Sequence, residues 1–593
     1  MATSELQPEV GSFTATQKEY LAGFMEGIAR RNHALSNGSG REDTGSRSPN
    51  PETIFGTPLV DVTKQERWKY EEHPLDGWDR ILAHAEADKL PNEEDTYRFR
   101  NFGIFFVGPA QNSFMLRVRV PAGELTALQL RGLGDLAEEF GNGTATITTR
   151  SNFQMREIAA RNLVNVLTRL QSLGLTSRGS GVDNVRNITT SPTAGFDPQE
   201  LIDTRPFAQA LHHYILNHRE LYGLPRKFNV AFEGGGSIDT LADTNDIGFV
   251  AVKIGPDSGE SLKDNSSVAL DPGIYFRVEL AGITGHKQFA RDSGILVKPS
   301  EALSVAVSMI RVFIEQGDRT DRKKARLKYL LDKAGVPKFL ADTQKKLGFP
   351  LIKFAREKCI QRSRALRHGH IGVYRQKQKG KNYIGVVVPV GVMTAKQMRR
   401  VADISTNYGS GQLRLTPWQN LLMPDVADGF VETVKRQLVR IGLHHEATNV
   451  AGGLVACTGN TGCKFAATDT KGQALALADY LNKRIQLDQP INIHLTGCPN
   501  SCAQHYIGDI GLQGVKVNSG GESVEGYNIV FGGGFGADAV IAKEVFKGLS
   551  FAEVPKLLER VLKSYLLQRN GSEAFVAFIG RHEIKHLQEM FSS

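Results

Sequence analysis

The sequence is poor in cysteine and has no long apolar run. It contains five cysteines among 593 residues, and no stretch approaches the roughly 18 apolar residues that a transmembrane helix needs. The odd number of cysteines, and the lack of an apolar signal segment in the opening MATSELQPEV, argue against a secreted protein held by disulfides. We therefore expect no membrane span and a cytoplasmic location, where thiols stay reduced.

The sequence also lacks concentrated charge. Its net charge is +9, from 72 basic and 63 acidic residues that are scattered along the chain. Because there is no arginine-rich tract and no nucleic-acid-binding signature, a nucleic-acid partner is not expected. The basic excess suits an anionic substrate, a polycarboxylate cofactor or an acidic protein partner, and charge alone does not choose among them.

Four of the five cysteines form two tight pairs. Cys457 and Cys463 are spaced C-x5-C, and Cys498 and Cys502 are spaced C-x3-C. Two loops that each supply two thiolates are a natural way to hold a four-iron cluster, because the sulfurs must converge on one cube. Structural zinc, disulfides and unrelated buried thiols are alternatives, although zinc-binding pairs normally lie about two to four residues apart. Cys359 has no partner nearby and is expected to be a small buried apolar side chain.

A stretch near residue 120 recurs near residue 390. MLRVRVPAGELTALQLRGLGDLAEEFGNGTATITTRSN aligns without a gap to YIGVVVPVGVMTAKQMRRVADISTNYGSGQLRLTPWQN, so that Pro121 matches Pro389, 268 positions later. Each copy indicates strand, turn, helix and strand, because β-branched runs such as Val118–Val120 stop at Pro and Gly, and Thr126 precedes Gln129 at capping-box spacing. A duplicated unit of this kind predicts a pseudo-twofold α+β pair.

The rest of the chain falls around these two copies. We expect a polar N-terminal tail with a helix over 17–31, and a mixed lobe after each copy. A site between the lobes, framed by both copies, is the natural place for a large cofactor. The predicted parts are a mobile tail 1–52, an extension with the first half-repeat 53–178, a first lobe 179–370, the second half-repeat 371–446 and a second lobe 447–593, which carries the cysteine pairs.

Two stretches around the cysteines resemble a known family. ACTGNTGCKFA and HLTGCPNSCAQHYIGDIGL resemble the siroheme- and cluster-binding region of assimilatory nitrite and sulfite reductases. The supporting motifs, which lie between about residues 97 and 535, are MLRVRVPAG, TTRSNFQ, DNVRNITTSP, LPRKFN, TNDIGFVA and GDRTDRKKARLKYL. The resemblance implies an α+β, three-lobed nitrite/sulfite reductase fold, in which two ferredoxin-like half-domains form the pseudo-twofold repeat beside two mixed α/β lobes.

The resemblance also implies two prosthetic groups, siroheme and a [4Fe-4S] cluster. At the matching positions, Cys457, Cys463 and Cys498 are implied to bind the cluster. Cys502 is implied to bind both the cluster and the siroheme iron, and so to couple them electronically.

Siroheme carries eight carboxylates, so its pocket must be rich in hydrogen-bond donors and positive charge. The resemblance assigns Arg150 and Arg226 to these carboxylates. The glycine runs 234–236 and 532–534 indicate either amide nests for the same groups or flexible turns. AGITG at 281–285 departs from a more glycine-rich family loop and leaves the contacts there open.

The resemblance also implies a set of cations that bind the substrate. Reduction of nitrite to ammonium consumes six electrons and eight protons, and Arg117, Arg186 and Lys227 match the family residues that hold the anion and relay protons. Asn229 stands where sulfite reductases of the family carry a second lysine, and one cation fewer suits a monoanion. Thr190 occupies the place of a crosslinking cysteine found in some sulfite reductases. Both positions indicate nitrite.

The chain has no N-terminal dinucleotide-binding unit and no length to spare for flavin and nicotinamide domains. The resemblance therefore implies ferredoxin, or flavodoxin, as a donor of single electrons. Lys464 and Lys471, near Cys463, are candidates for a basic patch that steers it, with ordinary surface lysines as the alternative. A monomer is expected, because the internal repeat already supplies a twofold partner. The histidines are assigned no role.

These observations predict a ferredoxin-dependent nitrite reductase. The near alternative is a ferredoxin-dependent sulfite reductase, which forms sulfide. A more remote alternative is a non-catalytic iron-sulfur electron carrier. The cations at 117, 186 and 227 argue against a carrier, because a carrier needs no oxyanion pocket.

Overall fold

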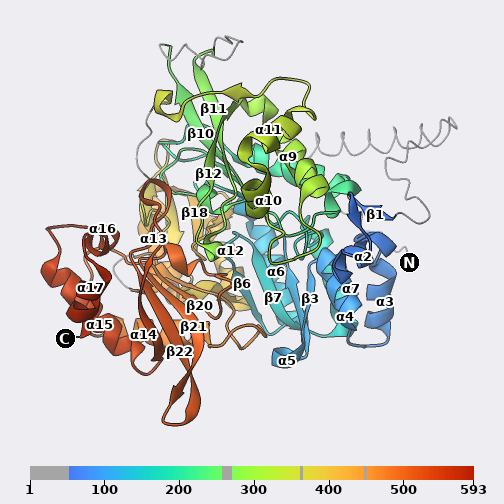
Figure 1. The fold of residues 1–593 in the computed structure, drawn as a ribbon. Coiled ribbons are helices and arrows are strands. Elements are labelled where there is room, and N and C mark those ends of the chain that lie inside the picture. The colour runs from blue at the N-terminus through green and yellow to red at the C-terminus, as the bar shows by residue number, and fades with distance from the viewer. Residues whose placement is uncertain (1–51, 257–269, 361–364, 447–449, 593) are drawn as a thin grey trace, which may run out of the picture. The chain divides into compact units, whose positions relative to one another are not determined.

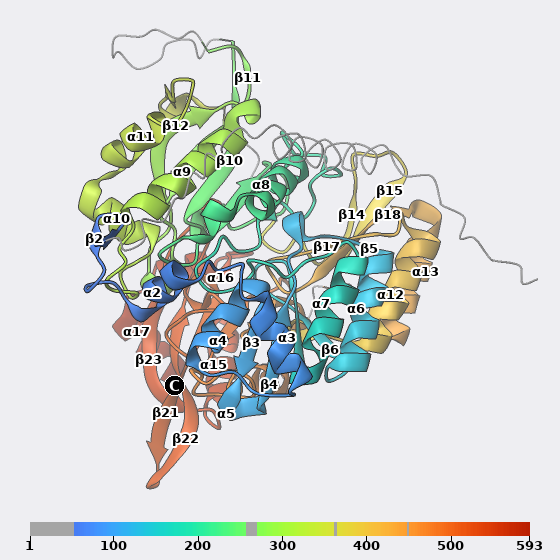
Figure 2. The ribbon, with the colours of Figure 1, turned by 90° about the vertical axis from the view of Figure 1, so that its right-hand side faces the viewer.

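The computed structural model describes residues 52–256, 270–360, 365–446 and 450–592. The predicted mobile tail, apart from Glu52, and its helix over 17–31 lie outside the described residues. Residues 53–593 form one compact unit (Figures 1 and 2), and the domain limits drawn inside it stay predictions. Within the described part of the chain, no helix is both long and apolar enough to cross a bilayer.

The two copies of the repeat form two five-stranded sheets that exchange strands. Their strand orders are β16-β6-β7-β4-β3 and β14-β15-β18-β17-β5. Strand β16 comes from the second copy and β5 from the first, so each sheet is completed by the other copy. The strands are β3 (Ile104–Val107), β4 (Ser113–Arg117), β5 (Glu124–Thr126), β6 (Thr144–Ile147), β7 (Phe153–Ile158), β14 (Gly372–Arg375), β15 (Lys381–Val386), β16 (Val392–Thr394), β17 (Gln412–Leu415) and β18 (Leu421–Ala427).

The helices α6 (Ala127–Phe140) and α12 (Ala395–Tyr408) begin at the predicted capping boxes. Thr126 Oγ1 accepts a hydrogen bond from the Gln129 amide at 3.1 Å, and the matching pair in α12 has the same distance. A Cβ atom at Gly134 would lie 3.1 Å from the first carbonyl oxygen of α12. Glycine therefore lets the two helices pack closely.

One predicted strand ends earlier than expected. Strand β4 stops at Arg117, before Val118–Val120. The Arg119 amide donates to the Thr176 carbonyl at 2.7 Å, so the chain leaves the sheet at this point.

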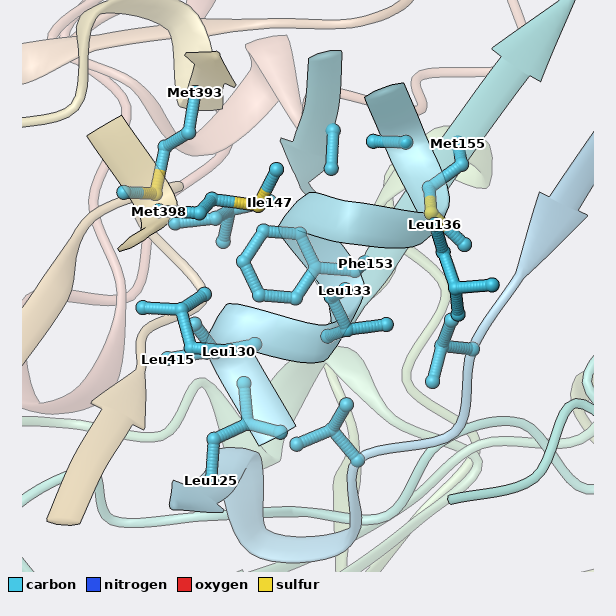
Figure 3. Close-up of a cluster of buried hydrophobic side chains, with 14 of the residues drawn as sticks. Leu125, Leu130, Leu133, Leu136, Ile147, Phe153, Met155, Met393, Met398 and Leu415 are labelled. Atoms are coloured by element: carbon cyan, nitrogen blue, oxygen red, sulfur yellow. The ribbon is translucent and has the colours of Figure 1, made fainter. Parts of the chain in front are cut away.

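Both copies contribute to one hydrophobic core (Figure 3). Leu133 and Phe153 of the first copy and Met393 and Met398 of the second copy are fully buried in this cluster. Because the core is shared, neither half-repeat buries its apolar face alone.

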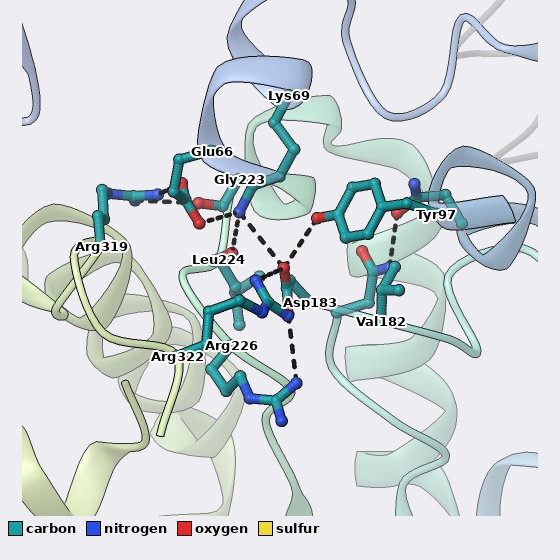
Figure 4. Close-up of polar contacts among 12 residues, drawn as sticks. Glu66, Lys69, Tyr97, Val182, Asp183, Gly223, Leu224, Arg226, Arg319 and Arg322 are labelled. Carbon is teal, nitrogen blue, oxygen red and sulfur yellow. Dashed lines mark hydrogen bonds and ion pairs between the residues drawn. The ribbon is translucent and has the colours of Figure 1, made fainter. Parts of the chain in front are cut away.

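An ion-pair cluster joins the N-terminal extension to the first lobe (Figure 4). Asp183 accepts from Tyr97 Oη at 2.8 Å and from both terminal nitrogens of Arg322 at 2.8 and 2.7 Å. Lys69 Nζ lies 3.7 Å from Asp183 and 2.6 Å from Glu66. Burial alone would raise the pKa of Asp183, but Lys69 and Arg322 bring it down to about 2.

The extension and the outer faces of the half-repeats are formed by short elements. These are β1 (Thr53–Ile54), β2 (Thr57–Pro58), α2 (Lys64–Glu71), α3 (Trp78–Glu86), α4 (Glu93–Phe99), α5 (Gly108–Gln111), α7 (Leu163–Ser172) and α13 (Val431–Arg440).

Each lobe is built on a mixed sheet, with orders β13-β12-β11-β10-β9-β8 and β19-β20-β21-β22-β23. The first three strands along the chain are parallel in both lobes, and the next two are antiparallel. The first lobe contains β8 (Thr189–Thr190), α8 (Arg205–Asn217), β9 (Val230–Glu233), β10 (Ile247–Ile254), β11 (Gly273–Leu280), β12 (Arg291–Val297), α9 (Ala302–Gln316), α10 (Leu327–Ala334), α11 (Val336–Gln344) and β13 (Ile352–Lys353). The second contains β19 (Leu454–Ala456), α14 (Thr470–Asn482), β20 (Ile493–Thr496), β21 (Ile510–Ser519), β22 (Glu522–Phe531), β23 (Lys543–Ser550), α15 (Val554–Gln568), α16 (Phe575–Gly580) and α17 (Ile584–Ser592).

The lobes repeat one another, which the sequence did not reveal. The short 3-10 helices η5 (Ala242–Thr244) and η12 (His505–Ile507) each follow a left-handed residue, Leu241 at φ 59° and Gln504 at φ 55°. Both pairs of positions are 263 residues apart. The duplication therefore covers each half-repeat together with its lobe.

Candidate functional site

The two cysteine pairs follow neighbouring parallel strands. Cys457 comes directly after β19, and Cys498 lies two residues after β20. Because the carboxyl ends of parallel strands meet at one sheet edge, the two loops lie side by side. The Gly497 amide donates to Cys457 Sγ at 3.2 Å, and the Ala467 amide donates to the Gly497 carbonyl at 2.7 Å.

The four thiols differ in exposure but lie near one another. Cys498 is buried, Cys457 and Cys463 are half-buried, and Cys502 is exposed. Although Cys502 keeps exposed surface, burial among the surrounding protein atoms raises the pKa of its thiol to about 11, with Cys457 adding to the rise and Lys227 opposing it. These groups are therefore close enough to shift each other's charge.

The donor set fits an iron-sulfur cluster. Two adjacent loops present four cysteines, which are the usual ligands of a four-iron cluster. Across the described residues, no three or more His, Cys, Asp or Glu side chains gather as a site for a single metal ion. The fit therefore depends on the thiolate chemistry and on the side-by-side loops.

Arg117 and Arg186 are the arginines predicted to hold substrate. Arg117 Nη1 donates to the Ser180 carbonyl at 3.3 Å, and Arg186 Nη2 donates to the Val182 carbonyl at 3.0 Å. Burial lowers the pKa of Arg117 to about 10, with the Cys502 thiol opposing, and burial and Arg117 lower the pKa of Arg186. No carboxylate among the described residues forms an ion pair with either, so both are uncompensated cations.

Lys227 is the third predicted cation. Burial lowers its pKa to about 7, with Arg326 and Arg186 adding to the decrease and Cys502 opposing it. An ammonium with this pKa exchanges its proton near neutral pH, which suits a proton donor.

Asn229 is held through its backbone. Its amide donates to Asp246 Oδ2 at 2.8 Å, and Arg326 donates to the same carboxylate from Nε at 3.1 Å and from Nη2 at 2.6 Å. Sequence reasoning missed Arg326, because the motif GDRTDRKKARLKYL holds five other basic residues and nothing local marks this one. Arg326 is also a large influence on Lys227.

Arg150 and Arg226, predicted to bind siroheme carboxylates, have protein partners. Arg150 donates to the side chain of Asn245 and, from Nη2, to the carbonyls of Asn187 at 2.5 Å and Val230 at 3.2 Å, while its buried Nε has no partner. Arg226 lies 3.9 Å from Asp183 at the edge of the ion-pair cluster (Figure 4). Their assignment to siroheme stays a prediction.

Two loops from elsewhere reach the cysteine loop. Thr149 Oγ1, from the TTRSNFQ motif, donates to the Cys502 carbonyl at 3.1 Å. A Cβ atom at Gly285, in the AGITG stretch, would lie 3.3 Å from the Asn500 carbonyl oxygen. The first half-repeat and the first lobe therefore both contact the loop that carries Cys502.

The structure corrects the prediction for one of the two lysines near Cys463 and excludes one of the two alternatives for the glycine runs. Lys471 is not a free surface lysine, because its Nζ donates to the Val390 carbonyl and burial lowers its pKa to about 7. Lys464 is exposed and lies 5.3 Å from the ring of Phe465. The glycine runs are not open amide nests, because amides in 234–235 and 532–534 donate to protein acceptors.

Comparisons with known proteins agree with this geometry. The family described as "Nitrite/Sulfite reductase ferredoxin-like half domain" matches residues 108–173 and 374–441, and "Nitrite and sulphite reductase 4Fe-4S domain" matches 181–351 and 449–590. The chain belongs to the nitrite/sulfite reductase family. These matches confirm the predicted repeat and fold class, and the second one supports an iron-sulfur cluster in this chain.

Members of the family are similar over most of the chain. A ferredoxin–nitrite reductase of Synechococcus elongatus is 33% identical over 523 residues, which are 86% of this chain and 98% of the relative. One from Leptolyngbya laminosa is 36% identical over 495 residues, 81% of this chain and 92% of the relative. The structure of Mycobacterium tuberculosis NirA superposes with a TM-score of 0.80 at 28% identity, and covers 89% of this chain and 97% of that one.

Proposed function

We propose that the protein reduces nitrite to ammonium with electrons from ferredoxin. The observation that carries this proposal is the set of half-buried cations without a paired carboxylate among the described residues, Arg117, Arg186 and Lys227, beside the exposed thiol of Cys502. A group of cations of this kind favours a small anion next to a metal-binding sulfur. Relatives named ferredoxin–nitrite reductase over most of the chain support the choice of anion and donor.

The chain offers ligands for both prosthetic groups of the family. Cys457, Cys463 and Cys498 would bind the [4Fe-4S] cluster, and Cys502 would be shared with the iron of siroheme. When bound, these groups would carry the donor's electrons one at a time and supply the metal centre for nitrite reduction. The buried and partnerless Nε atoms of Arg150 and Arg186 fit a polycarboxylate or anion in this region.

The protein's own groups bind the anion and move protons. Arg117 and Arg186 present fixed guanidinium donors, which orient an oxyanion. Lys227, with a pKa of about 7, donates a proton and recovers one from water near neutral pH. Arg326 holds Asp246, which in turn fixes the backbone beside Lys227.

Lys464 and Phe465 are the proposed contacts for the electron donor. They directly follow Cys463, and 64% of the Phe465 surface is exposed, which is unusual for so large an apolar side chain. A cation beside an exposed ring suits an acidic protein that must approach the cluster. Lys464→Glu should raise the KM for ferredoxin about tenfold while activity with a viologen dye is kept, and Lys333→Glu, an exposed lysine of the first lobe, should change neither.

The visible spectrum of the purified protein tests the proposal most directly. Siroheme bands that shift when nitrite is added, together with ammonium release from nitrite and reduced ferredoxin, are the expected result. A colourless protein that binds zinc would overturn it. A loaded protein that releases no ammonium would leave the electron-carrier alternative in its place.

Sulfite is the second candidate substrate, because the rest of the cation set suits either oxyanion. Asn229 in place of a second lysine favours nitrite. Asn229→Lys should therefore raise the ratio of sulfite to nitrite turnover, and Asn229→Gln should not. The monomeric state remains a prediction. The cytoplasmic location also remains a prediction, and the need for reduced thiols supports it.

A further inference from the structure

Arg156, which lies about 300 residues earlier in the chain, contacts the loop between the first two predicted cluster cysteines. It lies on β7 of the first half-repeat. Its Nη2 donates to Thr458 Oγ1 at 2.8 Å, and its Nη1 donates to the Gly462 carbonyl at 3.2 Å. Both acceptors lie between Cys457 and Cys463, so one guanidinium joins the two ends of the C-x5-C loop.

The loop is shaped to receive this guanidinium. A Cβ atom at Gly462 would lie 2.6 Å from Arg156 Nη1 and 2.9 Å from Thr458 Cγ2. Any side chain at this position would displace the arginine from the loop. Gly462 therefore leaves room for the guanidinium of Arg156.

The charge of Arg156 is not neutralised. Within the described residues, no carboxylate lies at ion-pair distance from its guanidinium, whose partners are Gln154, Thr458 and Gly462. Burial lowers its pKa, and the thiols of Cys463 and Cys457 oppose that change, so negative charge at these sulfurs stabilises the cation.

A second uncompensated cation lies near the same loop. Lys471, in the first turn of α14, donates to the Val390 carbonyl, and Cys457 is the largest influence that favours its charged form. The N-terminus of the 13-residue helix α14 also meets Cys457, because Thr470 Oγ1 donates to the Cys457 carbonyl at 2.8 Å. The helix dipole adds further positive potential there.

The second half-repeat shows that the cation is not required by the fold. Gly141 and Gly409 are matching positions of the two copies. A Cβ atom at Gly141 would lie 2.8 Å from the Arg156 carbonyl oxygen, and a Cβ atom at Gly409 would lie 2.9 Å from the Pro424 carbonyl oxygen. Pro424 therefore stands where Arg156 stands in the first copy. Only the copy that contacts the cysteine loop carries a cation at this strand position.

We propose that Arg156 is a positioning residue for the iron-sulfur cluster, which fixes the Cys457–Cys463 loop and, together with Lys471, raises the reduction potential of the cluster. The proposal rests on the cluster ligands proposed above. One-electron reduction adds a negative charge to the cluster, and two nearby half-buried cations stabilise the reduced form more than the oxidised form. The cluster is thereby easier for the donor to reduce.

A redox titration of the loaded protein, followed by the electron paramagnetic resonance of the reduced cluster, tests the proposal. Arg156→Gln should lower the ratio of reduced to oxidised cluster at a fixed potential about tenfold, which equals a shift of about 59 mV to more negative potential. Arg156→Lys should keep most of the wild-type potential but load less iron, because a lysine keeps the charge and cannot make both contacts. Arg169→Gln, an exposed arginine paired with Glu139, is the matched control and should change nothing.

Lys471→Gln keeps the arginine contacts and should shift the potential in the same direction, which serves as the test if Arg156→Gln does not load a cluster. An unchanged potential in a loaded charge-removing variant would overturn the inference while leaving nitrite reduction in place. A wild-type protein without a cluster would overturn both the inference and the proposed function.

Discussion

The two lobes place different groups at matching positions of one loop. The Gly234 amide donates to Ser191 Oγ at 3.0 Å in the first lobe, and the Gly497 amide donates to Cys457 Sγ at 3.2 Å in the second. At the same offset of 263, Asp239 of the first lobe stands where Cys502 stands in the second. The two lobes therefore share a loop backbone but carry side chains of different chemical types.

In the first lobe, hydrogen bonds to buried carboxylates hold the matching loops. Asp197 accepts from Thr193 Oγ1, from the Ser237 amide and from Ser237 Oγ, each at 2.6 Å. Glu233 accepts from Ser191 Oγ at 3.0 Å and from the Thr240 amide at 2.8 Å. These buried carboxylates connect the two loops without any added group.

The second lobe has thiols at these places, and thiols are weak hydrogen-bond partners. Its loops are joined by the hydrogen bonds of Gly497 with Cys457 and Ala467, and a cluster bound by the thiols would add the connections that carboxylates make in the first lobe. The comparison teaches that the two lobes share one backbone arrangement and differ at a few side chains. Those side chains decide whether the loops are held by their own hydrogen bonds or present ligands for a cofactor.

The largest expected effect comes from the position shared by Cys502 and Asp239. Cys502→Ser should reduce ammonium release to the background level, because the proposed shared ligand of the cluster and siroheme is lost. Asp239→Ser should keep both groups and most of the activity. Iron content, the visible spectrum and ammonium assays check this prediction, and retained catalysis in Cys502→Ser would contradict the assigned ligand.

Removal of iron should have the next largest effect, and it should change the second lobe and not the first. We expect amide hydrogen exchange to become about tenfold to a hundredfold faster in residues 457–470 and 497–505 of the iron-free protein, because the cluster no longer connects these loops. The matching first-lobe residues 191–204 and 234–242 serve as the internal control. Equal acceleration in both lobes would show that the cluster is not what holds the second pair.

Acid should act on the first lobe instead. The pKa of Asp183 is about 2 in the folded protein and about 3.9 in an unfolded chain, so its ion pairs stabilise the fold above about pH 4. This stability is lost as the pH falls toward 2. Asp183→Asn should cost about 3–5 kcal/mol at pH 7, because Lys69 and Arg322 lose their counterion.

Denaturant titrations between pH 2 and pH 7 measure this effect. The free energy of unfolding of the variant should vary less with pH than that of the wild type. Asp88→Asn, which removes an exposed carboxylate paired with Arg161, should lower the free energy of unfolding far less than Asp183→Asn does. A similar cost for both variants would contradict the importance given to burial.

The smallest expected effect is that of Ser191→Cys, which puts a thiol in the first lobe where Cys457 stands in the second. One thiol without three partners cannot hold a cluster, so iron content should not change. The free energy of unfolding should change by about 1 kcal/mol, because a weaker acceptor replaces Ser191 Oγ. Additional iron in this variant would show that the first lobe is closer to a cofactor site than its carboxylates suggest.

Local patterns in the sequence predicted the half-repeats well. The capping boxes at Thr126 and Thr394 form as expected, because the signal lies within four residues and needs no tertiary contact. Leu130, Leu133 and Leu136 are buried along α6, as their spacing predicts. The reciprocal exchange of β5 and β16 was not predictable, because three-residue strands carry no periodic signal.

The candidate site was predictable in part. The cysteine spacing indicated the cluster, and the resemblance supplied the substrate cations. The roles of Arg326 and Arg156 could not be read from the sequence, because their partners Asp246, Thr458 and Gly462 lie 80 to 306 residues away. The same distance effect hid Lys471, whose neighbours bury it although its local sequence suggests a surface lysine.

The sequence by itself determined the duplicated half-repeat, the pairs of thiols and the family, because each depends on residue types that lie close together along the chain. The tertiary structure alone decided which cations remain without counterions, which loops meet at the sheet edge, and that the lobes are also duplicated. The physical reason is that charge compensation and burial depend on groups brought together across hundreds of residues, whereas capping and ligand spacing act within a single turn or loop.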